Sequence, residues 1–330
     1  MLLSRMLDIT KLDLGIEIGM DLGQYPFRNL EMARIAPNNI RETDICAKEK
    51  TLLKGVACLL RLPKLKSLTF KCTRIRYLAA ALEDMPVRSP VVENIKIECE
   101  DITKESLRAL LTIPKCLGIF GWHGRAQLCR SLPGTFDEGC VTISNREFGQ
   151  ALRLVMHSLE TLALPWRTLH KCSHDAGMLG SLHEFKSLRC LTLAPQILLG
   201  SRSCFANDGS NGILEPEQLR SLLPQGLRGL GIAVERAGTK EPKDSIPRLV
   251  QGLVKNPKFN RILYVGLAQL LAPHTCSRCK AGEFDFDWQE FVDLRKLCRK
   301  VGIELKTNRW KLRRGELLAQ VAEEAAQAAE

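Results

Sequence analysis

One short apolar pattern recurs along the chain: an apolar residue, two variable residues, a second apolar residue, one variable residue and a third apolar residue. Its clearest copies are Leu65/Leu68/Phe70, Leu159/Leu162/Leu164 and Leu188/Leu191/Leu193. Less regular copies with the same spacing are Val92/Ile95/Ile97, Leu227/Leu230/Ile232, Phe259/Ile262/Tyr264, Ile9/Leu12/Leu14, Phe27/Leu30/Met32, Pro114/Leu117/Ile119 and Cys298/Val301/Ile303. The last apolar-x-apolar of each copy has a period of two, so each copy predicts a short strand that turns alternate side chains inward.

Amphipathic helices are predicted between these copies. A run from Thr43 to Leu62 forms one apolar helical stripe, made of Leu52, Leu53, Val56, Leu59 and Leu60. Ser144-Asn-Arg-Glu147 has the residues of a capping box and predicts a helix to about Met156. Two further helix starts are Asp287-Trp-Gln-Glu290, for a helix to Arg299, and Glu215-Pro216, for a helix with Leu219, Leu222 and Leu223.

Strands that alternate with helices predict parallel strands joined by crossover helices. The intervals between copies are too short for separate domains, so each unit must bury its apolar face against its neighbours. Such an organisation is a solenoid. We predict one α/β solenoid of about ten units over residues 1–308, followed at 309–330 by a charged, Ala/Glu-rich tail that is helical or disordered.

Composition narrows the class of protein. The 330 residues carry 48 Lys and Arg against 37 Asp and Glu, a formal charge of +11, and 45% of them are hydrophobic. No stretch is long and apolar enough for a transmembrane helix, and Arg5 and Asp8 interrupt the N-terminal apolar run. The 13 cysteines, an odd number, then predict reduced thiols rather than a disulfide framework. We expect an intracellular protein, cytoplasmic or nuclear, with no membrane partner.

The apolar pattern that follows amphipathic helices resembles the strand signature of the leucine-rich-repeat family. Its irregular spacing, and the forms at residues 64–70 and 186–193, resemble the repeat halves of fungal-type F-box proteins. The resemblance implies a ribonuclease-inhibitor-like fold with parallel strands and outer helices, and a non-catalytic protein-binding role. It further implies the substrate-recognition part of an F-box (SCF-type) ubiquitin ligase. No F-box precedes Ile9, so the ligase subunits would join through a segment absent from this sequence.

In such a solenoid, the residues between the inward leucines line a concave wall, where the resemblance places a protein substrate. The later units offer mostly small or weakly polar residues there: Thr161, Ala163, Cys190, Thr192, Gly229, Gly231, Arg261 and Leu263. The earlier units offer a mixed-charge set: Lys11, Asp13, Asn29, Glu31, Ser67, Thr69, Asn94 and Lys96. We expect the later half to bind the partner, although a long segment such as 194–215 could equally cover it.

A different function class follows from a basic cluster near the C-terminus. A repeat scaffold could bind RNA or an anionic surface through the patch of Arg309, Lys311, Arg313 and Arg314. Trp310 is the only aromatic residue within that patch, so base stacking has little support. A solvated helix whose basic residues face the acidic tail explains the same pattern, and nucleic acid is therefore the less favoured partner.

Two loops carry candidate metal ligands: His274, Cys276 and Cys279 in one, and His170, Cys172 and His174 in the other. The Cys-x-x-Cys spacing suits zinc, but a structural zinc needs four ligands and the loops follow strands three units apart. Cys298 could complete the first set but also fits an inward repeat position. We expect no metal and no cofactor. Nucleophile-elbow, phosphate-loop and dinucleotide signatures are missing, so we expect no enzymatic activity.

Overall fold

The main feature of the protein is an open parallel sheet built in chain order. The computed structural model describes residues 9–16, 27–37, 45–71, 74–75, 77–83, 92–99, 101–122, 143–164, 179–193, 197, 221–235, 245–255, 262, 264–270 and 288–307. The ten strands of the sheet are β1 (Lys11–Ile16), β2 (Met32–Pro37), β3 (Ser67–Lys71), β5 (Asn94–Glu98), β7 (Ile119–Trp122), β8 (Thr161–Leu164), β9 (Cys190–Leu193), β10 (Gly229–Glu235), β11 (Tyr264–Leu270) and β12 (Glu304–Thr307). Each strand pairs in parallel with the next one in this order, which confirms the predicted α/β class and is consistent with a solenoid.

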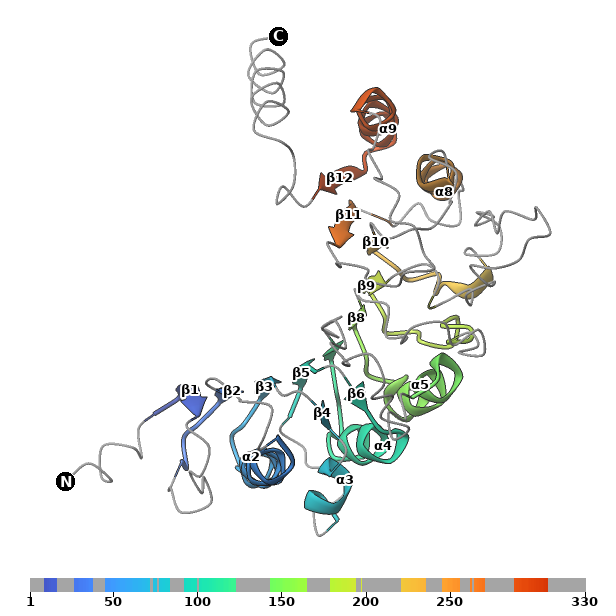
Figure 1. Ribbon diagram of the computed structural model, residues 1–330. Helices are drawn as coiled ribbons and strands as arrows, with labels where there is room; N and C mark the ends of the chain where they lie inside the picture. Colours follow the sequence, from blue (N-terminus) through green and yellow to red (C-terminus); the bar gives the residue numbers. More distant parts are fainter. Residues whose placement is uncertain are drawn as a thin grey trace, which may run out of the picture.

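The helices lie along one side of this sheet. They are α2 (Ile45–Leu60), α3 (Leu78–Ala81), α4 (Lys104–Thr112), α5 (Asn145–Leu152), η4 (Arg153–Val155), α8 (Ser245–Val254) and α9 (Trp288–Lys300). In Figure 1 the strands line the inner side of a broad arc and these helices form its outer side. A second, two-stranded sheet of β4 (Arg74–Ile75) and β6 (Asp101–Ile102) lies among the first units.

A backbone ladder aligns the starts of the strands. The carbonyl oxygen of Thr10 accepts hydrogen bonds from the N–H groups of Glu31 and Met32, at 2.9 and 3.0 Å. The same arrangement, in which one carbonyl accepts two N–H groups from the next unit, recurs at six further junctions up to β10. The accepting residues there are Glu31, Lys66, Glu93, Gly118, Glu160 and Arg189. The ladder involves no side chain, so it fixes the register and excludes only proline at the donating positions.

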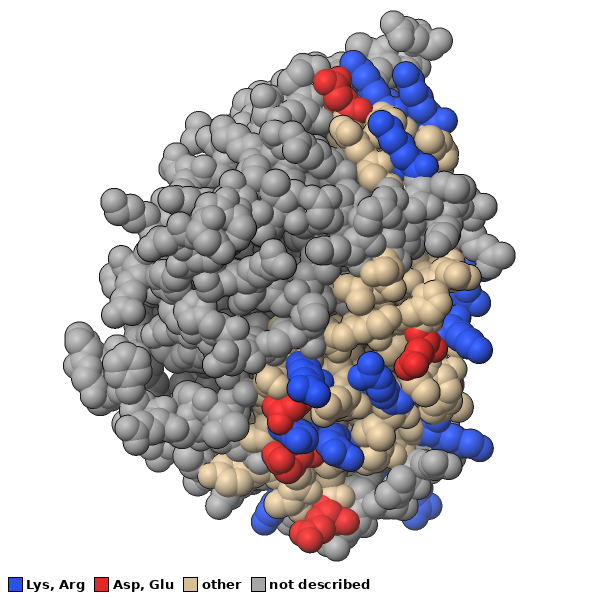
Figure 2. Space-filling view, turned by 90° about the vertical axis from the view of Figure 1, so that its right-hand side faces the viewer, with Lys and Arg blue, Asp and Glu red and all other residues tan. Residues whose placement is uncertain are grey.

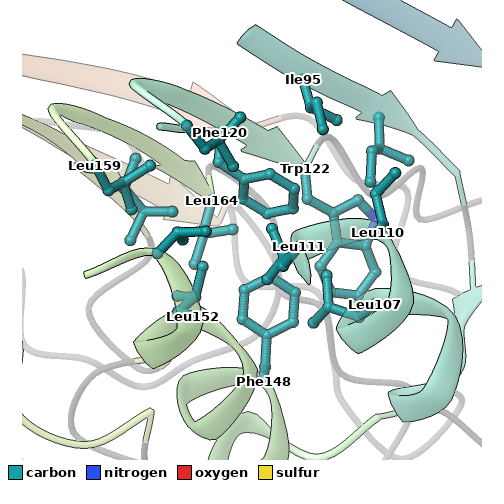
Figure 3. Packing of buried hydrophobic residues seen from close by; sticks show 14 of the residues in the cluster. Ile95, Leu107, Leu110, Leu111, Phe120, Trp122, Phe148, Leu152, Leu159 and Leu164 are labelled. Carbon is teal, nitrogen blue, oxygen red and sulfur yellow. The ribbon is translucent and has the colours of Figure 1, made fainter. Parts of the chain in front are cut away.

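The core lies between the strands and the helices. In β8, Leu162 and Leu164 are buried while the residues between them are half-buried, and β9 repeats this alternation. The aromatic centre of the core is drawn in Figure 3: the ring of Trp122 stacks on that of Phe148 at a centroid distance of 5.1 Å. The buried Trp122 Nε1 donates to the carbonyl oxygen of Cys99 at 3.2 Å, so its polar group is satisfied.

Most of the predicted helices are confirmed. Helix α2 runs from Ile45 to Leu60 and buries the predicted stripe of Leu52, Leu53, Val56, Leu59 and Leu60. Ser144 caps α5 through the predicted reciprocal box with Glu147, and the following η4 ends at Val155. Helix α9 covers Trp288–Lys300, whereas Asp287, Glu215, Pro216 and Leu219 lie outside the described residues.

The predicted frame is wrong in four of the weaker copies of the repeat. The strand register moves three of them by three residues, to Leu30/Ala33/Ile35, Leu117/Phe120/Trp122 and Ile262/Val265/Leu267, and moves the last by four, from Val301 to Leu305. In each of these copies, both the predicted and the observed alignment have an apolar residue at the central position, but only the observed one turns toward the helices. Met32 and Val301, which the prediction turned inward, are 45% and 48% exposed.

The capping box makes the stability of α5 depend on pH. The pKa of Glu147 is lowered, first by the hydrogen bond from the Ser144 backbone, then by the Ser144 hydroxyl. Lys104, whose Nζ lies 3.3 Å from a Glu147 carboxylate oxygen, lowers it further. A carboxyl whose pKa is lowered by folding stabilises the fold above its unfolded pKa, and this stabilisation is lost as the pH falls through the folded pKa.

We therefore predict that Glu147→Gln lowers the free energy of unfolding at neutral pH by about 0.5–1 kcal/mol, since glutamine keeps the cap but loses the charge. In acid, well below the ordinary carboxyl pKa, the difference between wild type and variant should vanish. Urea unfolding followed by circular dichroism at both pH values measures this. A difference that does not change with pH would contradict the charged cap.

A second prediction concerns Gly149, which lies on α5 where the helix meets the chain at Leu179. A Cβ atom at this position would overlap the carbonyl group of Leu179, and backbone atoms cannot turn aside as a side chain can. We expect Gly149→Ala to destabilise the protein by about 1–3 kcal/mol or more, despite the better helix propensity of alanine. Thermal unfolding checks this, with Gln150→Ala on the exposed side of α5 as the control that leaves the midpoint unchanged.

Candidate protein-binding surface

The face of the sheet opposite the helices carries the candidate site, and we call it the inner wall. It consists of two rows of residues that the strand register aligns across all ten strands. The first row is Lys11, Met32, Ser67, Asn94, Ile119, Thr161, Cys190, Gly229, Tyr264 and Glu304. The second row is Asp13, Arg34, Thr69, Lys96, Gly121, Ala163, Thr192, Gly231, Gly266 and Lys306.

The structure brings together six of the eight residues predicted for the later half of the wall. Thr161, Ala163, Cys190 and Thr192 are half-buried and occupy adjacent positions on β8 and β9, and Gly229 and Gly231 continue both rows on β10. Arg261 and Leu263 lie outside the described residues. The register gives the corresponding positions on β11 to Tyr264 and Gly266. That these residues bind a partner stays a prediction.

The earlier half of the wall is charged, and one part of its predicted composition is wrong. Asn29 and Glu31 precede β2, and the wall positions on that strand belong to Met32 and Arg34. Because the central apolar residue of this strand is the small Ala33, the sequence pattern does not indicate the alignment that the structure shows. The Arg34 guanidinium lies 3.6 Å from the Asp13 carboxylate, with 59% and 68% of the two side chains exposed. An ion pair this exposed stabilises the fold little and leaves both charges accessible.

From β7 to β10 the second row of the wall is shallow because its residues are small. On the second row, Gly121, Ala163, Thr192 and Gly231 follow one another on neighbouring strands. The Thr192 side chain fills the space above Gly231, since a Cβ there would lie 2.5 Å from Thr192 Oγ1 and 2.9 Å from Cγ2. Long charged side chains therefore stand on β1, β2 and β5, whereas the small second-row residues keep β7 to β10 close to the surface of the wall.

Charged residues also stand directly before several strands, such as Glu31 before β2, Lys66 before β3 and Arg189 before β9. Lys66 Nζ lies 3.3 Å from a Glu31 carboxylate oxygen, and Arg189 donates to the carbonyl oxygen of Gly226 at 3.3 Å. On the face seen in Figure 2, Lys and Arg side chains lie among Asp and Glu side chains over the described surface. The described part of this face therefore carries both signs of charge rather than a patch of one sign.

The other sequence candidates are placed as follows. The basic patch of Arg309, Lys311, Arg313 and Arg314 lies outside the described residues, as do the candidate metal ligands His170, Cys172, His174, His274, Cys276 and Cys279. Cys298 is described, and burial raises the pKa of its thiol, as suits an inward position on α9. Within the described ranges, no group of three or more His, Cys, Asp or Glu side chains could hold a metal ion.

Comparisons with known proteins add little to this picture. No family model and no curated protein matches the chain. A solved structure of a structural-genomics target protein from Bacteroides fragilis aligns with 87% of this chain and 67% of its own, at 11% identity and a TM-score of 0.39. Among the helices of the described residues, none is long and apolar enough to cross a membrane.

The contact between Gly231 and Thr192 gives a testable prediction. Gly231→Ala should lower the free energy of unfolding by about 1–3 kcal/mol, because the new methyl group meets the Thr192 side chain. Thr192→Gly in the same chain removes that side chain and should recover part of the loss. Chemical unfolding of the two single variants and the double variant measures the coupling. Additive effects would show that the two positions are independent.

Proposed function

We propose that this chain is an irregular leucine-rich-repeat solenoid that binds another protein on its inner wall and performs no catalysis itself. The observation that carries the proposal is the unbroken alignment of ten strands, which presents two continuous rows of residues on the face opposite the helices. At about 4.8 Å between strands, the wall is roughly 40 Å long, which matches the footprint of a protein partner rather than a small ligand.

The leucine-rich-repeat assignment is supported by the coincidence of motif and strand. The first apolar residue of each clear copy, such as Leu65, Leu159 or Leu188, is fully buried just before its strand. The next two apolar residues are the buried positions of that strand. Short copies of this kind cannot bury their apolar faces alone, and stacking them in chain order is the solution that repeat proteins use.

The two halves of the wall suit different parts of a protein interface. The charged side chains of Lys11, Asp13, Arg34 and Lys96 provide electrostatic complementarity, which favours one orientation and one class of partner over others. The small residues of β8 to β10 allow a partner to approach the sheet closely and exclude water. A partner bound across both halves would be oriented by the first and held by the second.

The resemblance to F-box proteins suggests the specific role. In this proposal the wall recognises the substrate of an SCF-type ubiquitin ligase, and a segment outside this sequence joins the ligase. Co-purification of cullin-ligase subunits with a longer form of the gene product, but not with the present chain, is the expected result. Recovery of other stable partners without ligase subunits would separate the wall-binding function from the ligase role.

We predict that Ala163→Arg abolishes partner capture while the chain remains folded. Arginine at this position replaces a small wall residue between Gly121 and Thr192 with a long charged side chain that a partner close to the sheet would meet. Gln150→Arg adds the same charge at an exposed position of α5. It is the matched control and should capture the partner as wild type does. Quantitative affinity purification from cells of the source organism, with circular dichroism of each variant, provides the measurement.

The result also separates the two function classes. Equal capture by wild type and Ala163→Arg would overturn the wall as the binding surface. Changing Arg309, Lys311, Arg313 and Arg314 to Glu should leave protein capture intact. If that variant instead loses a salt-sensitive RNA ligand, the basic patch is the functional surface.

A further inference from the structure

Strand β1 forms one end of the sheet, and within the described residues it pairs with β2 alone. The carbonyl of Thr10 points toward β2, where it accepts two N–H groups. Backbone groups of alternate residues in a strand point to opposite edges, so the N–H and C=O groups of Lys11 and Asp13 face away from β2. An edge of this kind is a template for pairing with another strand.

The core is thinly covered at this end. Leu12 and Ile9 are half-buried, whereas the residues at the position of Leu12 in inner strands, Leu68 and Ile95, are completely buried. A further strand beside β1 would cover Leu12 as each inner strand covers the one before it. The edge at β1 thus presents both backbone hydrogen-bonding groups and the apolar surface of Leu12 to an additional strand.

The charges of Lys11 and Asp13 determine which register between two copies of β1 is favourable. Antiparallel pairing of β1 with β1 of a second copy must oppose residues whose backbones face the edge, namely Lys11 and Asp13. Centring the pair on Lys11 or on Asp13 places identical charges opposite each other. Centring it on Leu12 places each Lys11 opposite the Asp13 of the other copy, twice over, on the wall side, and places Leu12 opposite Leu12 on the core side.

The geometry points to self-association: we infer that a second copy of this chain pairs antiparallel with β1 about a twofold axis at Leu12. Both charged side chains are exposed, and Asp13 keeps 68% of its side chain accessible beside Arg34, so its carboxylate can also accept from Lys11 of the second copy. Such an interface is isologous and closes as a dimer. The inference goes beyond the proposed function and does not depend on it.

Charge reversal tests the pairing, with sedimentation velocity of the full chain as the measurement. Wild type should sediment as a dimer. Lys11→Glu and Asp13→Lys should each sediment as monomers, because like charges then face each other twice, and the dissociation constant should rise about tenfold or more. An equimolar mixture of the two variants should dimerise again, since both acidic side chains of the Lys11→Glu copy then face lysines of the Asp13→Lys copy.

The matched control is Lys96→Glu, which reverses an exposed charge on the same wall but on β5, away from the edge, and should remain dimeric. The double variant Lys11→Glu/Asp13→Lys should also dimerise, which shows that a lost dimer in the single variants is not a folding defect. A monomeric wild type overturns the inference. So do single variants that dimerise as wild type does, or a mixture of them that stays monomeric.

Discussion

The carbonyl ladder at the strand starts is the constraint on which the rest of the fold depends. One backbone oxygen per unit accepts two N–H groups of the next unit, from Thr10 through Arg189. Because only backbone atoms take part, the ladder tolerates Glu31, Lys66 or Gly118 equally well. It also fixes only the point where each strand begins, so the chain between strands can vary in length. Irregular intervals and a regular sheet are therefore compatible.

Because the backbone ladder sets where strands begin and side chains set which face is inward, only some parts of the fold follow from the sequence. Copies with three large aliphatic or aromatic residues, such as Leu65/Leu68/Phe70, predict both a strand and its inward face, and the box at Ser144 predicts the start of a helix. The copy around Leu117 is ambiguous, because Ile119 and Phe120 are both apolar. In the structure Phe120 and Trp122 take the inward positions, and Trp122 stacks on Phe148, a residue far away in the chain that no local period reveals.

The residues of the candidate site are likewise predictable only where the apolar pattern of their strand is unambiguous. Alternation places Thr161, Ala163, Cys190 and Thr192 on the wall from sequence alone, since their strands are framed by leucines on both sides. Arg34 is missed because Ala33 is a weak apolar marker, and its proximity to Asp13 follows from the register between two strands rather than from either strand. The close contact of Gly231 with Thr192 likewise arises between strands. Sequence patterns thus predict well which face of the sheet a residue occupies. They predict which residues are neighbours on adjacent strands only where the inward positions of both strands are unambiguous.

An open sheet leaves two kinds of surface for association, and in this protein they meet. The helices occupy one face, so among the described residues the inner wall and the end strands β1 and β12 remain. Lys11 and Asp13 belong to both, because their side chains stand on the wall while their backbones face the edge. Pairing at β1 would join two walls through their charged first strands and leave the small residues of β8 to β10 away from the dimer contact. Self-association and partner binding would then use different parts of one continuous surface, which allows both to occur in the same assembly.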